Sequence, residues 1–469
     1  HYYSRFDCRI PFLNGGLFEP TNDYSWQQYD FNIPNELFSN NDTTKSGDSG
    51  DGILDVFDRY NFTVREDESL EKEVAVDPEM LGKVFENLLE VKDRKSKGAF
   101  YTPREIVHYM CQESLINYLD AKLNIQRVPI DNNSQKTLLP ELSETDLLTE
   151  YEAKYNPIVS KDDITDFIYH GDSFRENDAM TKSKGRETSS YRFKLSESIR
   201  KSAKAIDQAL ADVKVCDPAI GSGAFPVGIM HEIVRARLTL LESGLIKKTD
   251  KTNAYEYKRC AIQQSIYGVD IEESAIEIAK LRLWLSLVVD EVDMDEIKPL
   301  PNLKYKIIKG NSLLGIDKDL LNNHLFQELE RLKELYFDET RKSKKRKYER
   351  KISNIIKSFA KEGQFDFEVF FSEVFSKNGG FDIVIGNPPY MGEGKQGGIL
   401  SQYKNHKYYK GKGNIWFLFG CVGVDILKKS GCQCYIAPSN WITAAGASKL
   451  REKMLGECKI NNFIDFGNY

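Results

Sequence analysis

The sequence predicts an α/β fold, a doubly wound sheet with helices on both faces, preceded by a mainly helical N-terminal region. Two observations support this class. Short apolar runs in the second half of the chain have the length and composition of buried strands, and helical segments separate them. Alternating strands and helices of this kind build a parallel sheet. The predicted strands are 213–216, 265–269, 305–308, 381–385 and 433–437, and the predicted helices between them are 224–242, 273–289 and 417–429.

The chain divides into three predicted regions. Residues 1–76 form an irregular segment rich in aromatic, Asn, Asp and Gly residues. Residues 77–212 hold a helix over 78–97, a second helix with Thr102 as its cap and Pro103 in its first turn, and a charged insertion with one further helix at 196–211. We expect Ile106, Val107, Met110 and Leu115 to form the buried face of the second helix. Residues 213–469 form the predicted catalytic domain, interrupted by a long charged helical region at 320–361.

Composition limits the kind of partner. The 469 residues carry 65 Lys+Arg and 71 Asp+Glu, a net charge of −6, so a nucleic-acid site must be a local patch. Eight scattered cysteines are typical of a reduced, cytoplasmic protein. The closest pair, Cys432 and Cys434, lacks the spacing of a metal knuckle, and we expect it to be structural and borne on a strand. No apolar run approaches the roughly 20 residues that a membrane span requires.

The first two strands end in residues suited to a nucleotide-like cofactor. Gly221 and Gly223 follow Asp217 at a strand-to-helix turn, where glycines allow a ligand to approach the backbone closely. A tight turn alone would explain the same glycines. Asp270 ends the second strand, where a carboxylate can accept hydrogen bonds from ribose hydroxyls, and Ile271 can pack on a purine. A helix cap explains Asp270 equally well and is compatible with the ribose role.

The fourth strand runs into Asn387-Pro388-Pro389-Tyr390. The two prolines hold the turn rigid, which fixes the Asn387 amide and the Pro388 carbonyl in space while Tyr390 presents an aromatic ring. Two acceptors that hold the hydrogens of an exocyclic amine would direct its lone pair at an electrophile, and the ring would stack on the base that carries the amine. A structural Pro-Pro turn is the weaker alternative.

Together these residues resemble the S-adenosylmethionine-dependent adenine-N6 DNA methyltransferases, and in particular the methylase region of fused, type IIG-like restriction-modification enzymes. The order of the motifs carries the resemblance, which covers about residues 77–469. Segments 98–103, 217–225, 267–271, 309–314 and 387–390 are similar to motifs X, I, II, III and IV, and 413–419 and 435–441 to motifs V and VI. Residues 13–19 resemble a segment that precedes the methylase region in such fused enzymes.

The resemblance implies a Rossmann-like methyltransferase sheet and assigns a role to each motif residue. A bacterial cytoplasmic enzyme would methylate an adenine that is flipped out of duplex DNA, with no metal. Many relatives have Asp at the position of Asn311. The implied cofactor residues are Phe100, Tyr101 and Thr102, which line the cofactor; Asp217, Ala219, Gly221 and Gly223, which cradle it; Asp270 on the ribose; Ile271 on the adenine; and Asn311 and Ser312 at the adenine amino edge. The implied catalytic residues are Asn387 and Pro388 as acceptors, Pro389 in the rigid turn and Tyr390 as the stacking platform.

Partners and alternatives follow from the same resemblance. The implied partner is double-stranded DNA with a specific recognition sequence, and the base-reading domain of the family follows the catalytic fold. We expect 461–466 to be the sixth of seven strands, so that the chain ends inside its own catalytic domain. A recognition domain would follow it, and any nuclease domain would precede it. Methylation of glutamine N5 in proteins, methylation of cytosine N4 and an inactive DNA-binding scaffold remain the alternatives.

Three charged segments have uncertain roles. The loop 392–413 interleaves lysines with tyrosines beside the predicted catalytic residues, which suits contact with DNA but equally a mobile polar loop. The basic run 341–351 favours a solvated helix, with contact to the DNA backbone as the alternative. Asp77-Pro78 followed by Glu90-Val91-Lys92 imitates a metal-nuclease motif, but the residues between them predict one helix where that motif needs paired strands.

Overall fold

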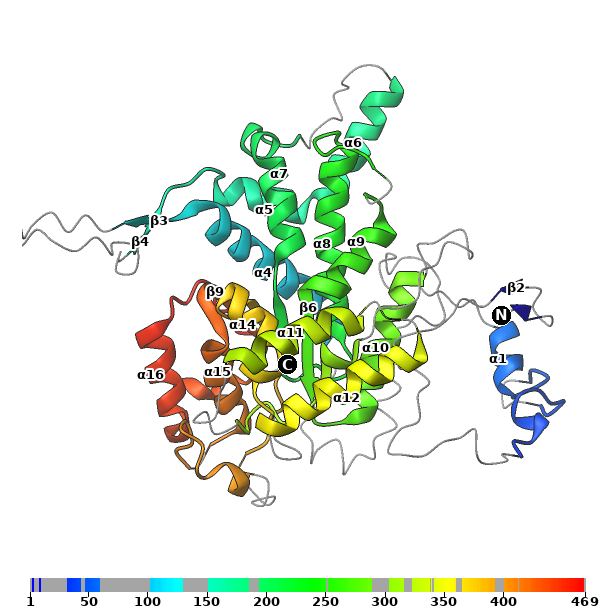
Figure 1. Cartoon of the computed structure of the whole chain (residues 1–469). Helices are drawn as coiled ribbons and strands as arrows, with labels where there is room; N and C mark the ends of the chain where they lie inside the picture. The colour runs from blue at the N-terminus through cyan, green and yellow to red at the C-terminus, as the bar shows by residue number, and fades with distance from the viewer. Residues whose placement is uncertain are drawn as a thin grey trace, which may run out of the picture.

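Five parallel strands form the central sheet of the molecule (Figure 1). Their order is β7-β6-β5-β8-β9, so the chain runs outward from β5 to β7 and then returns to the other side of β5. All five predicted strands are therefore present, and the α/β class is confirmed. The computed structural model describes residues 2–3, 8–9, 32–43, 47–59, 102–129, 151–184, 194–249, 252–288, 303–315, 323–337, 339, 341–359, 365–392, 400–411 and 413–467.

Both faces of the sheet are covered by helices. Alternate side chains of a strand point to opposite faces, and here they enter two separate hydrophobic cores. Val215, Ile307 and Ile383 pack with α4, α8 and α10, whereas the next residue of each strand packs on the other face with α13, α14 and the end of α15. Strands buried on both faces explain the continuous apolar runs in the sequence.

The elements of the sheet region match the predicted ones closely. The predicted helix at 224–242 has the bounds of α8, and that at 273–289 is one residue longer than α10. The strands are β5 (Val215–Asp217), β6 (Ile266–Asp270), β7 (Ile307–Lys309), β8 (Phe381–Gly386) and β9 (Leu427–Tyr435), and the helices are α8 (Ala224–Glu242), α9 (Ala254–Cys260), α10 (Glu273–Val288), α11 (Asn323–Phe337), α12 (Lys342–Phe359), α13 (Phe367–Phe370), α14 (Ser372–Asn378), α15 (Ile415–Asp425) and α16 (Ser448–Glu457).

The region before the sheet holds more regular structure than the sequence predicts. Val107, Met110 and Leu115 of α4 are buried as expected and Ile106 is half-buried, and Ser196 caps α7 by accepting from the Ile199 N–H. The insertion, however, also contains two helices and a hairpin that its polar composition concealed. The described elements here are β1 (Tyr2–Tyr3), β2 (Cys8–Arg9), α1 (Ile53–Arg59), α4 (Arg104–Asn124), β3 (Ile125–Pro129), β4 (Tyr151–Tyr155), α5 (Lys161–Tyr169), α6 (Gly171–Lys184) and α7 (Glu197–Asp212).

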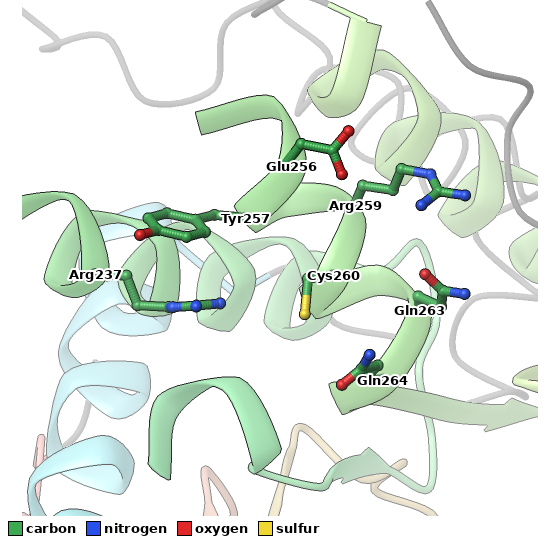
Figure 2. A pocket seen from close by; sticks show the side chains of 7 residues that line it. All are labelled: Arg237, Glu256, Tyr257, Arg259, Cys260, Gln263 and Gln264. Carbon is green, nitrogen blue, oxygen red and sulfur yellow. The ribbon is translucent and has the colours of Figure 1, made fainter. Parts of the chain in front are cut away.

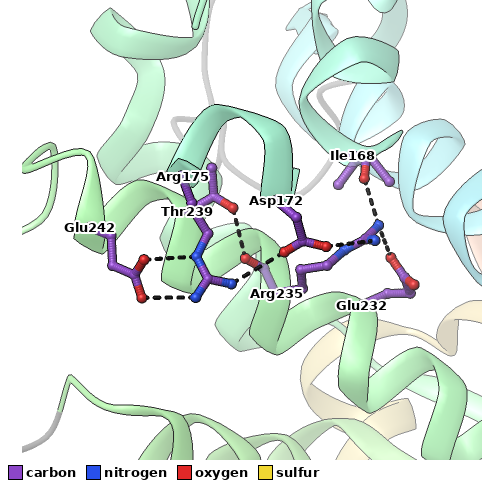
Figure 3. Close-up of polar contacts among 7 residues, drawn as sticks. All are labelled: Ile168, Asp172, Arg175, Glu232, Arg235, Thr239 and Glu242. Carbon is purple, nitrogen blue, oxygen red and sulfur yellow. Dashed lines mark hydrogen bonds and ion pairs between the residues drawn. The ribbon is translucent and has the colours of Figure 1, made fainter. Parts of the chain in front are cut away.

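Charged side chains fasten this region to α8, as Figure 3 shows. Arg175 of α6 binds Glu242 at 2.8 Å, and Arg235 of α8 reaches both Asp172 and the Ile168 carbonyl. Arg235 also pairs with Glu232, whose buried carboxylate accepts from the α4 side chains as well. These ion pairs add to apolar packing, because Ile164, Phe167 and Ile168 of α5 and Phe174 of α6 are buried in the core.

Two element boundaries differ from the prediction. Thr102 does not cap α4; Pro103 occupies the cap position without a side-chain bond, and the Thr102 hydroxyl is used elsewhere. The predicted helix at 417–429 ends at Asp425 in α15, and β9 begins at Leu427 because this segment pairs with Phe381 of β8. Sheet pairing has overridden the helical propensity of the last residues. Cys432 and Cys434 lie on β9, as predicted.

The prediction of a sixth strand at 461–466 is wrong. These residues are exposed and pair with no strand in the described part of the chain; Asn461 and Asn462 instead bind Asn117 and Glu113 of α4. Strand propensity depends on context, and this segment is held at the surface by its bonds to α4 and does not extend the sheet beyond β9. The predicted helix at 78–97 and the segment 77–92 lie outside the described residues. Among the described helices, none is long and apolar enough to span a membrane.

Candidate functional site

The candidate site lies at the carboxyl edge of the sheet, where the strand order reverses. β5 and β8 are neighbours, and the glycine turn follows β5 while Asn387-Pro388-Pro389-Tyr390 follows β8. Open α/β sheets bind ligands in the crevice at such a reversal. The tertiary structure thus brings together two segments that are separated in sequence by the whole of β6, β7 and the charged helices.

The glycine turn has a backbone that only glycine adopts readily. Gly221 and Gly223 have φ angles of 52° and 87°, in the left-handed region. A Cβ at Gly223 would also lie 2.9 Å from Cβ of Ala279 in α10, so α8 begins in close contact with α10. These two glycines are required by the turn itself, and α8 begins directly after it, where the first N–H groups of a helix have no partner within that helix.

Asp270 joins the glycine turn to α10. Its Oδ2 accepts from the Gly221 N–H at 2.9 Å, and its Oδ1 accepts from the Glu272 N–H at 2.8 Å. Burial raises the pKa of Asp270, while these two N–H donors oppose that rise. Each carboxylate oxygen retains capacity for a further hydrogen bond, so the two roles predicted from the sequence, helix cap and ligand acceptor, are geometrically compatible. Ile271 beside it is 58 % exposed, which is unusual for an isoleucine.

Asp217 is buried beneath the turn. Its Oδ1 accepts from the Ala219 N–H at 3.0 Å, whereas its Oδ2 has no hydrogen-bond partner among the described residues. Burial, with a smaller contribution from Asp270, raises the pKa of Asp217 to about 8. A Cβ on Gly386 would lie 2.5 Å from Asp217 Oδ1, so the residue before Asn387 rests directly on this carboxyl. Asp217 therefore supports both halves of the site.

The Asn387 amide is held at both of its ends. Nδ2 donates to Thr102 Oγ1 at 2.9 Å, and Oδ1 accepts from the hydroxyl of Tyr390, which also lies 2.6 Å from the Ile436 carbonyl. Burial raises the pKa of Tyr390 well above its usual range, so its hydroxyl remains a donor. The bond to Thr102 leaves the oxygen of the amide as the atom that can accept from a ligand.

The loop after β7 packs on the glycine turn. Ser312 donates to the Pro218 carbonyl at 2.6 Å, and the Asn311 amide donates to the Tyr403 hydroxyl at 2.9 Å while its oxygen accepts from the Leu313 N–H. Both side chains thus lie near the turn but are engaged within the protein. Tyr403 belongs to the tyrosines of the loop 392–413 that the sequence predicts beside the site, but its bond to Asn311 has no signal in the sequence.

The described part of the loop 392–413 is partly neutralised. Lys407 binds Asp425 at 2.7 Å, Lys453 binds the same carboxylate at 2.8 Å, and Tyr408 donates to it at 2.8 Å. Lys404 and Lys410 are exposed. The tyrosines therefore serve packing and internal hydrogen bonds here. Lys395 and Lys412 lie outside the described residues.

Most of the predicted site residues converge on this edge. Thr102, the residues of the glycine turn, Asp270, Ile271, Asn311, Ser312 and the four residues from Asn387 to Tyr390 lie on its loops, while Phe100 and Tyr101 lie outside the described residues. The contact of Gly386 with Asp217 and the bond of Tyr403 to Asn311 were not predicted from the sequence, because both depend on packing across the sheet.

A separate cavity of about 470 Å³ lies near the start of β6, at the opposite edge of the sheet. Figure 2 shows Arg237, Tyr257 and Cys260 among its lining residues. The Arg237 guanidinium lies 4.0 Å from the centre of the Tyr257 ring and binds Asp207 at 2.8 Å. Its residues come from α8, α9 and the short π-helix that precedes β6, so it is distinct from the candidate site.

Comparisons with known proteins show which families this chain is similar to. Residues 264–469 match a family model described as Eco57I restriction-modification methylase. The chain is 24% identical over 549 residues to a putative type II restriction enzyme and methyltransferase of Methanocaldococcus jannaschii, covering 97% of this chain and 40% of the relative. It is 27% identical over 280 residues to the type II restriction enzyme and methyltransferase Eco57I of Escherichia coli, covering 56% and 23%.

A third relative, DNA methyltransferase A of Bacillus subtilis, is 25% identical over 221 residues, covering 45% of this chain and 19% of the relative. The chain therefore spans less than half the length of each of these curated relatives.

Proposed function

We propose that this chain transfers a methyl group from S-adenosylmethionine to N6 of an adenine flipped out of duplex DNA, as the methylase part of a restriction-modification enzyme. The observation that carries the proposal is the Asn387 amide: its nitrogen is bound to Thr102, so its oxygen is presented beside the rigid Pro388-Pro389 turn. The names of the three relatives, which include restriction enzymes and DNA methyltransferases, support the same class of reaction.

The crevice suits the proposed cofactor. Gly221 and Gly223 keep the turn free of side chains, Asp270 can accept from ribose hydroxyls, and the exposed Ile271 offers an apolar surface for a purine ring. The buried Asp217 Oδ2 has no partner among the described residues, as expected of an atom that a ligand or water completes. Asn311 and Ser312 lie beside the turn, where a rearranged Asn311 amide would reach the adenine amino edge. S-adenosylmethionine would supply an electrophilic methyl group on a sulfonium centre.

The residues of the chain act on the target amine. The Asn387 oxygen and the Pro388 carbonyl would accept the two N6 hydrogens, which withdraws the nitrogen lone pair from the ring and aims it at the methyl group. Tyr390 would stack on the flipped base. The Tyr390 hydroxyl donates to the Asn387 oxygen in this structure. We expect that hydrogen bond to break when adenine enters, so that the hydroxyl donates to the Ile436 carbonyl instead. One N6 proton leaves to solvent.

The direct test measures methyl transfer by the 469-residue chain. Mixed-sequence duplex DNA is incubated with the cofactor, and the nucleosides are analysed by mass spectrometry; N6-methyladenine is expected, and Asn387→Ala should abolish it. Only methylcytosine, or methylated glutamine in an added protein with unmodified DNA, would assign the chain to one of the alternative classes.

Cofactor binding is tested separately by calorimetry. Asp270→Ala should weaken binding of S-adenosylmethionine at least tenfold, because the carboxylate both shapes the turn and accepts from the ribose. Glu197→Ala, an exposed carboxylate on α7, is the matched control and should bind normally. Equal affinities in the two variants would contradict the cofactor site.

A further inference from the structure

One face of α12 concentrates positive charge in a chain that is acidic overall. The helix carries eight Lys and Arg residues and a single acid, Glu349, whereas the whole chain has a net charge of −6. A helix that only needs solubility usually alternates charges of both signs. The excess on α12 is therefore a local feature that the composition of the chain does not explain.

The cations and the apolar side chains occupy different faces of α12. Ile352 is fully buried against Leu329, Leu332 and Tyr336, and Lys345 is folded onto the Tyr336 ring. This apolar contact with α11 anchors the helix. The exposed positions are Lys344, Arg346, Lys347, Arg350, Lys351 and Lys357, which we call the cationic face.

Neighbouring acids offset the charge of the cationic face only in part. Glu349 binds Lys304, and Glu334 of α11 binds Lys377 of α14 at 3.0 Å. Glu328 of α11 lies near enough to Lys351 for the lysine to help lower the pKa of Glu328, but its ion pair is with Arg331. The residues of the cationic face form no ion pair with another described residue. Arg346 and Arg350, and likewise Lys347 and Lys351, are like charges four residues apart, an arrangement that destabilises an isolated helix. A bound polyanion would offset this electrostatic destabilisation of α12.

The helix is connected with the candidate site through α13. In Figure 1, α12 lies beside α11, and its Glu349 binds Lys304 just before β7. α12 contacts α13, and Phe365 just before α13 packs where a Cβ of Gly310 would be, one residue from Asn311. A long anion that passes over the loop after β7 can therefore extend along α12.

We infer that the cationic face of α12 binds the phosphate backbone of duplex DNA beside the candidate site. The identity of the polyanion rests on the function proposed above, while the surface itself rests on the charges and packing of α12. Flexible, exposed Lys and Arg side chains bind phosphates without reading sequence, so the helix increases affinity for any duplex and does not select the target.

The test compares DNA binding of the full chain and of a triple variant. Lys344→Gln, Lys347→Gln and Lys351→Gln are combined, and the affinity for a 30-base-pair duplex is followed by fluorescence anisotropy at several salt concentrations. Each lost phosphate contact lowers the slope of log affinity against log salt by about one. We expect the slope to fall by about two to three, and the affinity at ~0.1 M salt to fall at least tenfold.

Two controls make the result specific. The combination of Arg200→Gln, Lys201→Gln and Lys204→Gln removes three exposed cations of α7 and should bind DNA as the unmodified chain does. The triple Lys→Arg variant at 344, 347 and 351 keeps the charge and should retain binding. Failure of the unmodified chain to bind duplex DNA, or equal slopes in the α12 and α7 variants, would overturn the inference.

The readouts separate this inference from the proposed function. Calorimetric binding of S-adenosylmethionine should be the same in both Gln variants, because neither touches the crevice. Loss of salt-dependent DNA binding with intact cofactor binding supports the role of α12. The opposite result would be intact DNA binding in a chain that binds no cofactor or transfers no methyl group. It would count against the proposed methyl transfer but not against DNA binding by α12.

Discussion

The side-chain nitrogen of Asn387 donates a hydrogen bond of 2.9 Å to the hydroxyl oxygen of Thr102, across 285 residues of sequence. Thr102 is 6% exposed, so the bond is shielded from solvent. An amide can turn by 180° and exchange its donor for its acceptor. The bond to Thr102 selects the orientation in which oxygen remains available, and this gives Thr102 a positioning role besides the cofactor contact predicted from the sequence.

Thr102→Val should lower kcat for DNA methylation about tenfold, which corresponds to ~1.4 kcal/mol, the net contribution of one buried hydrogen bond. Valine keeps the shape of threonine but cannot accept from the amide. Thr102→Ser restores an acceptor and should recover most of the rate. Affinity for S-adenosylmethionine should change less than twofold in both variants; a large loss of affinity with normal kcat would return Thr102 to a purely cofactor-binding role.

Tyr390→Phe and Tyr390→Ala should differ in their effects on the rate of methyl transfer. They should also differ in their effects on the binding of DNA that contains an abasic site opposite the target adenine. Phenylalanine keeps the ring and removes only the hydroxyl that donates to the Asn387 oxygen. We therefore expect kcat to stay within about threefold of the unmodified chain. Alanine removes the stacking surface, which is worth about 1–3 kcal/mol per base. Steady-state kinetics and 2-aminopurine fluorescence measure the two effects; equal losses in both variants would show that the hydroxyl, not the ring, is the functional group.

Gly386→Ala should lower the free energy of unfolding by about 1–3 kcal/mol, because the new Cβ would lie 2.5 Å from Asp217 Oδ1 in a packed core. The displaced Asp217 and Asn387 should also reduce methyl transfer. Gly456→Ala in α16 is the matched control, since its Cβ meets no atom within 4 Å and its helix favours alanine. Urea denaturation compares the two variants, and equal stabilities would contradict the close contact.

Asp217→Asn should remove a pH dependence of stability. The pKa of Asp217 is raised to about 8 in the folded protein, above its ordinary value of 3.8. Its stabilising contribution is therefore complete below about pH 4 and is lost as the pH rises to about 8. Asparagine keeps an acceptor for the Ala219 N–H and does not titrate. Urea denaturation at pH 5, 6.5 and 8 should show the unmodified chain losing stability relative to the variant; parallel curves would mean that Asp217 is ionised throughout.

The sequence by itself determined the order of strands and helices in the sheet region and the carboxyl ends of the strands to within two residues. Strands buried on both faces must be apolar throughout, and the turn at Gly221 and Gly223 requires residues without a Cβ, so both leave a local signal. The same holds for α8, whose predicted bounds match the structure. The helices α5 and α6 were not predicted, because the charged composition of this region outweighed a short apolar signal. Ile164, Phe167 and Ile168 nevertheless recur at helical spacing in α5 and are buried in the core.

Only the tertiary structure decided how the candidate site is assembled. The contact of Thr102 with Asn387, the support of Gly386 on Asp217 and the bond between Asn311 and Tyr403 all join segments far apart in the chain. Hydrogen bonds and close contacts depend on tenths of an ångström between atoms, whereas sequence patterns report the local backbone and which side of an element is buried. The sequence therefore placed the residues on the correct loops, and packing across the strand reversal between β5 and β8 gave them their orientations.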